Sequence, residues 1–368
     1  MGDSKKQRGL LGRLALFVLT LLALVGLVAT ALSVVNPYID PKRMVWTTLF
    51  GLAFWEIFIY DVVVFLLLLL LWSKRAWIAL LSLLVAFPGL SRSYALGSKV
   101  ETPNSVRVMT YNVHNFDHVD GETSKEQFAL YVADMVREQN PDLFCCQEFS
   151  AFKSGVTRPR CIEDFAESAG FQYIYYNRKN NYGGNVIFSK YPITKVSEES
   201  GFGKEKTYGV MVEVDAGEKG KFHLANVHLL SYKITDSEID VLTNTSERQS
   251  MDTVGKTVLH KLAYAFQRRS DELQEVLQGM PPVGGPIIIC GDFNEPPLSY
   301  NYRQMQKAGY MDTFMKVGHG IKPTYAGKLP LLRIDYIWAN DKVTPLSFKR
   351  HREKASDHYP IMLDFKIQ

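Results

Sequence analysis

Hydrophobic residues are concentrated in the N-terminal part of this chain. Residues 14–35 carry no charged side chain and form a run long enough to cross a bilayer as a helix. Two more apolar segments follow at 45–72 and 76–96. The pattern therefore predicts a membrane anchor over residues 1–96, a bundle of about three transmembrane helices.

A cleaved signal peptide is the alternative for the first segment, with Ala29-Thr30-Ala31 as a candidate cleavage site. The apolar run is long for a signal peptide, however, and more apolar sequence follows it. Six Lys/Arg residues lie before the first segment and in the 73–75 turn, against two in the loop at 42–43. The positive-inside rule then predicts a multi-pass protein of the inner or plasma membrane, with a cytoplasmic N-terminus and residues 97–368 outside the cytoplasm.

Two acidic residues, Glu56 and Asp61, interrupt the second apolar segment. Acids within a membrane are costly and are often functional. They are five positions apart, so they do not share one face of a helix. We interpret them as a sign that this helix is tilted or lies partly at the membrane interface.

The pattern changes after a linker at 97–105. Short runs of β-branched and aromatic residues predict strands, and apolar positions three and four apart predict helices between them. Arg268 and Arg269 lie on the longest predicted helix, where a solvated face is the default interpretation. Mixed strands and helices indicate one layered α/β domain over 106–368. The predicted strands are 106–113, 141–148, 184–190, 208–214, 222–230, 286–290, 333–339 and 359–367, and the predicted helices are 124–139, 161–169, 256–279 and 299–308.

Charge and cysteine content narrow the classes of function. The net charge is +4, but residues 1–96 hold nine Lys/Arg and four Asp/Glu, which leaves 33 and 34 for residues 97–368. The second part thus has a balance of −1 and lacks the global positive field of many nucleic-acid-binding proteins. The four cysteines form no CxxC pair, so we expect them to be core residues.

Polar residues stand at the ends of the predicted strands. Asn226 and His228 are two positions apart, as are Asp292 and Asn294, so each pair points to one face of its strand. Buried acids and amides are expensive unless they are paired or bind a metal. A cluster of carboxylates, amides and histidines suits the hydrolysis of a phosphoester with a hard divalent cation. The other members of the predicted cluster are Asn112, Glu148, Asp335, Asp357 and His358.

A set of short motifs, in this order, resembles the endonuclease/exonuclease/phosphatase superfamily, which includes proteins similar to deoxyribonuclease I. The resemblance covers about residues 106–367, and the helical N-terminus resembles a membrane-tethered bacterial branch. It implies a four-layer α/β sandwich with two central, mostly antiparallel sheets. The motifs are 109-MTYNVHNF-116, 147-QE-148, 226-NVHL-229, 291-GDFN-294, 335-DYI-337 and 356-SDHYPI-361.

The resemblance implies a metal site for Mg²⁺ or Mn²⁺. Glu148 matches the principal metal ligand, and Asn112 and Asp357 would lie near the metal or support its waters. His114 stands where some members of the family carry a further carboxylate. The number of acidic ligands is therefore open, and we interpret His114 as a residue at the rim of the site.

The resemblance also assigns catalytic roles. Asp292 would align or deprotonate the attacking water, with Asn294 holding the phosphate or that water. His358 would contact the scissile phosphate and be oriented by Asp335. His228 is a candidate phosphate contact or proton donor. Asn185 differs from the small or apolar residue found there in many members, and it has no predicted role.

Three functions remain open from the sequence. The first is a membrane-anchored, metal-dependent phosphodiesterase of the nuclease type, acting on nucleic acid. The second is a phosphoesterase that acts on lipid headgroups or small molecules, similar to sphingomyelinases or inositol phosphatases. The third is a non-catalytic membrane module, which the complete set of motif residues disfavours. The expected partners are a phosphodiester substrate and the membrane, and no obligate protein partner is inferred.

Overall fold

The computed structural model describes residues 9–100, 104–177, 184–196, 201–202, 208–234, 237–238, 241, 248–281, 284–327, 329, 331–352 and 355–368. The chain divides into two compact units. The helical unit comprises Met1–Ser93 together with Pro297–Tyr300. The sandwich unit comprises Tyr94–Pro296 and Asn301–Gln368.

The helical unit contains one helix that is long and apolar enough to span a membrane, over Leu10–Tyr38. Two helix pairs pass the same test only when each pair is taken as one bent span, with bends of 68° and 43°. The unbroken segments predicted at 45–72 and 76–96 are therefore each divided. In the second pair Pro88 lacks the N–H that would continue the preceding helix. The elements are α1 Leu10–Val35, η1 Asn36–Tyr38, α2 Trp46–Leu52, α3 Phe54–Leu70, α4 Ala76–Val85 and α5 Phe87–Ser93.

Asp61 of α3 is fully buried inside the helical unit, whereas Glu56 is exposed. The Thr30 hydroxyl donates to Asp61 Oδ2 over 2.6 Å, and the Ser82 hydroxyl donates to the same oxygen. A Cβ added to Gly26 would lie 1.9 Å from Asp61 Oδ1, so α1 and α3 approach closely there. Asp61 thus joins α1, α3 and α4 through polar contacts, a common device between apolar helices, rather than marking an interfacial position.

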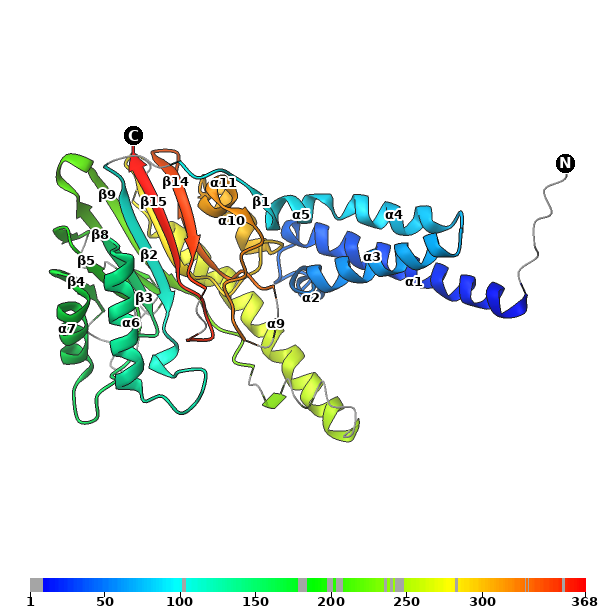
Figure 1. The fold of residues 1–368 in the computed structure, drawn as a ribbon, viewed down its shortest axis with the longest axis horizontal. Helices are drawn as coiled ribbons and strands as arrows, with labels where there is room; N and C mark the ends of the chain where they lie inside the picture. Colours follow the sequence, from blue (N-terminus) through cyan, green and yellow to red (C-terminus); the bar gives the residue numbers. More distant parts are fainter. Residues whose placement is uncertain are drawn as a thin grey trace. The chain divides into compact units, whose positions relative to one another are not determined.

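The sandwich unit is built on two mixed sheets (Figure 1). One has the order β11-β13-β10-β9-β8-β6, with β7 also paired to β8, and the other has the order β14-β15-β2-β3-β5-β4. In each sheet a single pair of the described strands is parallel, β9 with β10 and β2 with β3. The prediction of mostly antiparallel sheets is confirmed. The strands are β1 Ala95–Leu96, β2 Val106–Asn112, β3 Leu143–Gln147, β4 Tyr173–Tyr176, β5 Val186–Ser189, β6 Ile193–Lys195, β7 Gly201–Phe202, β8 Gly209–Asp215, β9 Lys221–His228, β10 Ile287–Asp292, β11 Met311–Asp312, β12 His319–Gly320, β13 Asp335–Ala339, β14 Val343–Arg350 and β15 Ile361–Ile367.

Alternating side chains build three cores and hence four layers. Along β10, Ile288 and Cys290 enter the core between the two sheets, while Ile287 and Ile289 pack on the outer face. Helices α6 and α7 cover the outer face of the β2–β3 sheet, and α9 and α10 cover that of the β9–β10 sheet (Figure 1). The predicted four-layer α/β sandwich is confirmed. The helices are α6 Lys125–Gln139, α7 Arg158–Ala169, α9 Arg248–Gln278, α10 Tyr300–Lys307 and α11 Thr313–Val317.

Local sequence explains where several elements begin and end. Ser124 and Gln127 form a capping box at the start of α6, and Gly170 adopts a left-handed conformation at the end of α7. All eight predicted strands are present. Seven strands of the described chain were not predicted, and six of these have only two to four residues. The seventh, β14, contains Pro345, which disfavours a strand except at the edge of a sheet, where β14 lies.

Candidate active site

Along the central strands, the side chains that point between the two sheets are apolar over most of the strand and become polar at one end of the sandwich. On β10, Asp292 follows Ile288 and Cys290 on the inner face. The register places Asp292 opposite His228 of β9 and opposite Asp335 of β13. Three neighbouring strands therefore bring a histidine and two carboxylates side by side, although the residues are more than a hundred positions apart from first to last.

The other sheet contributes Asn112 at the end of β2 and Glu148 just after β3. The Asn112 amide donates to Glu148 Oε1 over 3.0 Å and to Asp292 Oδ2 over 3.1 Å. Asn112 thus connects carboxylates that belong to different sheets. A second link between the two sheets lies next to it, where the side-chain amide of Gln147 on β3 donates to Asn226 Oδ1 on β9 over 2.6 Å.

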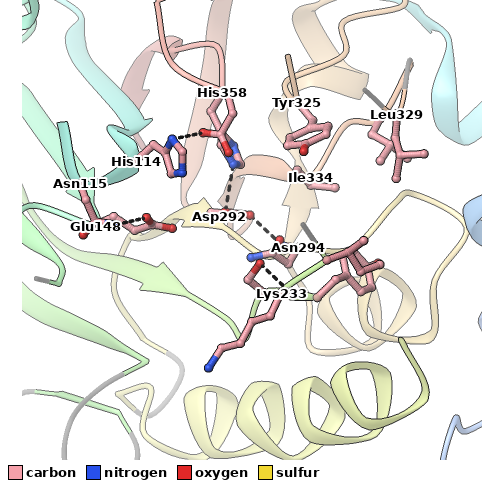
Figure 2. A pocket seen from close by; sticks show the side chains of 15 residues that line it. His114, Asn115, Glu148, Lys233, Asp292, Asn294, Tyr325, Leu329, Ile334 and His358 are labelled. Carbon is pink, nitrogen blue, oxygen red and sulfur yellow. Dashed lines mark hydrogen bonds and ion pairs between the residues drawn. The ribbon is translucent and has the colours of Figure 1, made fainter. Parts of the chain in front are cut away.

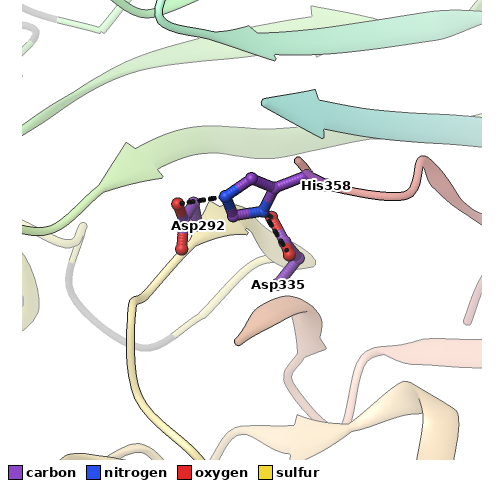
Figure 3. Close-up of side chains that lie close together, drawn as sticks. All are labelled: Asp292, Asp335 and His358. Carbon is purple, nitrogen blue, oxygen red and sulfur yellow. Dashed lines mark hydrogen bonds and ion pairs between the residues drawn. The ribbon is translucent and has the colours of Figure 1, made fainter. Parts of the chain in front are cut away.

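His358 lies between two aspartates (Figure 3). Its Nδ1 is 2.9 Å from Asp335 Oδ2, and its Nε2 is 3.6 Å from Asp292 Oδ2. Burial disfavours the charged imidazole, but Asp335 and Asp292 outweigh burial and raise the pKa of His358 well above its ordinary value. The two carboxylates therefore favour the charged form of the ring.

Asp292 is almost completely buried and has a defined orientation. The backbone N–H of Asn294 donates to its Oδ1 over 2.8 Å. Burial raises the pKa of Asp292, an effect that the positive charge on His358 partly offsets. His228 Nε2 lies 3.7 Å from Asp292 Oδ2 and 3.6 Å from Glu148 Oε1, and this buried nitrogen has no hydrogen-bond partner among the residues that the structure describes.

The remaining predicted residues lie at the rim. Asp357 is half-buried and accepts a hydrogen bond from the Ser356 hydroxyl over 3.1 Å. His114 Nδ1 is 3.7 Å from Asp357 Oδ1, and its side chain is partly exposed. This position agrees with the interpretation of His114 as a rim residue.

Five of the eight predicted site residues line one cavity of about 290 Å³, namely Glu148, Asp292, Asn294, Asp357 and His358. Asn112, His228 and Asp335 lie behind this lining, where Asn112 and His228 approach Asp292 and Asp335 approaches His358. Figure 2 shows Tyr325, Leu329 and Ile334 on one side of Asp292, and Glu148 and Asn115 on the other. The cavity therefore has a charged side and an apolar side. Its lining residues are His114, Asn115, Glu148, Ser231, Tyr232, Lys233, Ile234, Asp292, Asn294, Tyr325, Leu329, Leu332, Ile334, Asp357 and His358.

The backbone around the cavity is unusually strained. Ten non-glycine residues of the described chain have a positive φ, and five of them line the cavity. Such conformations cost free energy and gather at functional sites. The five are His114, Asn115, Glu148, Lys233 and Asn294, with φ between 46° and 54°.

Sequence reasoning missed several of the lining residues. Asn115 donates to Glu148 Oε2 over 2.8 Å and so holds the second oxygen of that carboxylate. Lys233 and Tyr325 carried no motif that could have identified them. Asn185 is buried, and its Oδ1 has no hydrogen-bond partner among the described residues.

The interpretation of Arg269 as part of a solvated face is wrong. Its side chain is fully buried, and its Nε is 2.7 Å from Glu295 Oε1. Arg269 Nη1 also donates to the carbonyl oxygen of Leu230 over 2.9 Å. The residue thus ties α9 to the two loops that follow His228 and Asp292.

The donor set fits a divalent cation. Carboxylate oxygens of Glu148, Asp292 and Asp357 all face the cavity, and these are the ligands that Mg²⁺ and Mn²⁺ prefer. The buried Nε2 of His228, which lacks a described partner, is a further group that an ion or its water could satisfy. Asp292, Asp335 and His358 also offer three atoms within 4.8 Å of one another. We favour the Glu148 side, because an ion bound between Asp335 and His358 would break their hydrogen bond.

Comparison with known proteins places these residues in a wider group. A family model described as the endonuclease/exonuclease/phosphatase family matches residues 109–358. A second model, described as a domain of unknown function, matches residues 14–93. The curated relative named uncharacterized protein YbhP, from Escherichia coli K12, is 24% identical over an alignment of 283 residues, and the match covers 72% of this chain and 97% of that protein.

Two solved structures of bacterial proteins are similar to this chain. An endonuclease/exonuclease/phosphatase from Bacteroides vulgatus has a TM-score of 0.51 and 14% identity, covering 73% of this chain and 100% of that one. Another from Beutenbergia cavernae has a TM-score of 0.49 and 19% identity, covering 72% of each chain. The first of these likenesses supports the fold alone.

Proposed function

Because the chain belongs to the endonuclease/exonuclease/phosphatase family, we propose that it is a membrane-anchored, divalent-metal-dependent phosphoesterase that hydrolyses phosphodiester bonds as a nuclease-type hydrolase. The observation that carries the proposal is the convergence of Glu148, Asp292 and His358 on one cavity, although they come from three distant parts of the chain. Members of this family are generally phosphoesterases.

The proposed reaction is attack of a water oxygen on phosphorus, with breakage of the bond between phosphorus and the leaving oxygen. Asp292 accepts a proton from the water, and the Asn294 N–H and the Asn112 amide fix its carboxylate. The His358 cation, held by Asp335, neutralises charge on the phosphate oxygens. His228 is the candidate donor of the proton that the leaving oxygen needs.

Glu148 is the proposed principal metal ligand, with Asp357 and Asn112 beside it. The Asn112 and Asn115 amides orient its two oxygens in the present geometry. When bound, Mg²⁺ or Mn²⁺ would supply positive charge to polarise the phosphate and acidify water.

The decisive experiment uses the full-length chain in lipid nanodiscs with bis(p-nitrophenyl) phosphate and Mg²⁺. We expect Asp292→Ala and His358→Ala each to lower kcat/KM by at least about a hundredfold, as for the loss of an acid–base or positioning group. Asp341→Ala and His319→Ala are matched controls, because both residues are exposed and lie outside the cavity lining. Equal rates in the wild type and both site variants would refute the proposal.

We also propose the division of the chain into an anchor at 1–96, a linker at 97–105 and a catalytic domain at 106–368. The apolar helix Leu10–Tyr38 supports association with a membrane. The multi-pass arrangement, with the catalytic domain outside the cytoplasm, rests on the bias of basic residues toward the N-terminus and the 73–75 turn.

A further inference from the structure

The two sides of the cavity differ in a way that bears on the substrate. Beside the catalytic groups stands an apolar wall of Tyr325, Leu332 and Ile334, with Leu329 at its edge. On another side Lys233, which carries a positive charge, lines the cavity. The proposed reaction at phosphorus uses neither feature.

The position of the Tyr325 ring is determined by its neighbours. Tyr325 pairs antiparallel with His358 in an isolated bridge, and the two ring centroids are 5.6 Å apart at 77°. Its backbone N–H donates to the Leu332 carbonyl oxygen over 3.1 Å. A Cβ added to Gly327 would lie 2.2 Å from the Tyr325 hydroxyl oxygen, so the ring occupies space that the glycine leaves. A planar aromatic group is therefore held next to the catalytic histidine.

Lys233 is held in a costly conformation at the cavity. Its φ is 52°, although it is not glycine. The Lys261 ammonium group donates to the Lys233 carbonyl oxygen over 3.0 Å and is itself paired with Glu238 at 2.6 Å. The Lys233 ammonium group has no hydrogen bond or ion pair with any residue that the structure describes. Within the described part of the chain, no acidic group neutralises its charge.

We infer that the site takes a nucleotide unit with two phosphates, an inference that rests on the function proposed above. The scissile phosphate lies at Asp292 and His358, and the base or its attached ring packs on Tyr325, Leu332 and Ile334. The neighbouring phosphate pairs with Lys233. Aromatic side chains bind bases by stacking without reading their sequence.

This chemistry disfavours the common lipid headgroups. A choline group is a cation, which Lys233 would repel, and a single aromatic ring is less than the cage such cations require. An inositol ring is polar on its whole edge and would leave hydroxyl groups without partners against Leu332 and Ile334. A nucleotide base is a flat, largely apolar ring that can pack on the apolar side of the cavity, and the second phosphate of the nucleotide can pair with Lys233.

The first test compares three esters with the same leaving group on the full-length chain in nanodiscs. They are methyl p-nitrophenyl phosphate, thymidine 5′-(p-nitrophenyl phosphate) and the latter carrying a 3′-phosphate. We expect kcat/KM to rise at least about tenfold from the methyl ester to the thymidine ester, which corresponds to about 1.4 kcal/mol. We expect a further rise of about threefold or more with the 3′-phosphate, which weakens as salt increases.

Substitutions of the lining residues test which side of the cavity causes each rise in kcat/KM. Tyr325→Ala should remove most of the preference for thymidine, while Tyr325→Phe should retain it because the ring remains. Lys233→Met should remove the gain from the 3′-phosphate. Tyr264→Ala and Lys256→Met are the matched controls, because both residues are exposed on α9 and neither lines the cavity.

A binding measurement separates this inference from the function on which it rests. Calorimetry with thymidine 3′,5′-bisphosphate should show binding at least about tenfold tighter than methyl phosphate, with the excess lost in Tyr325→Ala. Hydrolysis of the methyl ester without any preference for thymidine would overturn the inference and leave the hydrolase intact. Binding of the bisphosphate without hydrolysis of any ester would support the inference and defeat the hydrolase.

Two further substrates test whether such a nucleotide comes from a free dinucleotide or from the end of a polymer. A free dinucleotide and a ten-residue oligothymidylate should both be cleaved, and a higher kcat/KM for the oligomer would identify polymer ends as the source. Failure to cleave either, with the p-nitrophenyl esters still hydrolysed, would contradict the inference.

Discussion

Replacement of Arg269 by methionine is expected to destabilise the sandwich unit strongly, although Arg269 touches no predicted catalytic residue. Its guanidinium group is fully buried, pairs with Glu295 at 2.7 Å and lies 4.0 Å from the centre of the Tyr232 ring. The variant would leave the Glu295 carboxylate, which is 4% exposed, without its cation.

The magnitude follows from that burial. Removing one member of a buried ion pair costs about 3–5 kcal/mol, because the other charge stays out of water without compensation. Arg269 also donates to the Leu230 carbonyl oxygen, so a backbone acceptor loses its partner as well. For a domain of this size the loss corresponds to a fall in Tm of about 6–20 °C.

The cysteines of the chain provide the assay. All four are buried, and all lie in the sandwich unit, so a fluorogenic thiol reagent reports the unfolding of that unit alone. Full-length protein in nanodiscs would be heated with the reagent present. Arg268→Met is the matched control, since this neighbouring arginine is only partly buried and should change Tm by no more than about 2 °C.

A double variant tests the physical reason. Arg269→Met combined with Glu295→Met removes both charges and should recover much of the lost stability, because apolar residues of similar size can replace a buried ion pair. If Arg269→Met melted within about 2 °C of the wild type, the reasoning from burial would be refuted. If the double variant were less stable than either single variant, the stranded carboxylate would not be the cause.

Three further predictions concern the charge, metal and topology of the protein. Asp335 helps to raise the pKa of His358, so activity that needs the imidazolium should persist below that pKa and fall above it. Asp335→Asn should move this fall in the pH profile of kcat/KM to lower pH. An unchanged profile would contradict the assignment. EDTA should abolish hydrolysis, and Mg²⁺ should raise the Tm of the wild type more than that of Glu148→Gln, which a titration followed by the thiol reagent would measure. An alkaline phosphatase fusion after residue 100 should be active and one near residue 74 inactive, and the reverse result would place the catalytic domain in the cytoplasm.

Much of the fold and of the candidate site could be predicted from the sequence because the relevant signals are local. Side chains alternate along a strand, so Asp292 continues the phase of Ile288 and Cys290 without any knowledge of the neighbouring strands. The same reasoning applies to His228, and the motif order resembles a known family. Apolar runs likewise predicted the helices of the N-terminal unit, although not the bends that divide two of the predicted segments.

The partners of buried groups were decided only by the tertiary structure. Periodicity shows that a helix has an apolar stripe, but it does not show which segment covers the opposite face, and Arg269 is buried because two loops pack over it. Asp61 finds the hydroxyls of Thr30 and Ser82 only when three helices associate. Lys233 and Tyr325 reach the cavity through loop conformations that carry no sequence period. Side-chain direction within one strand is a property of a few neighbouring residues, whereas burial and pairing depend on contacts between residues far apart in the chain.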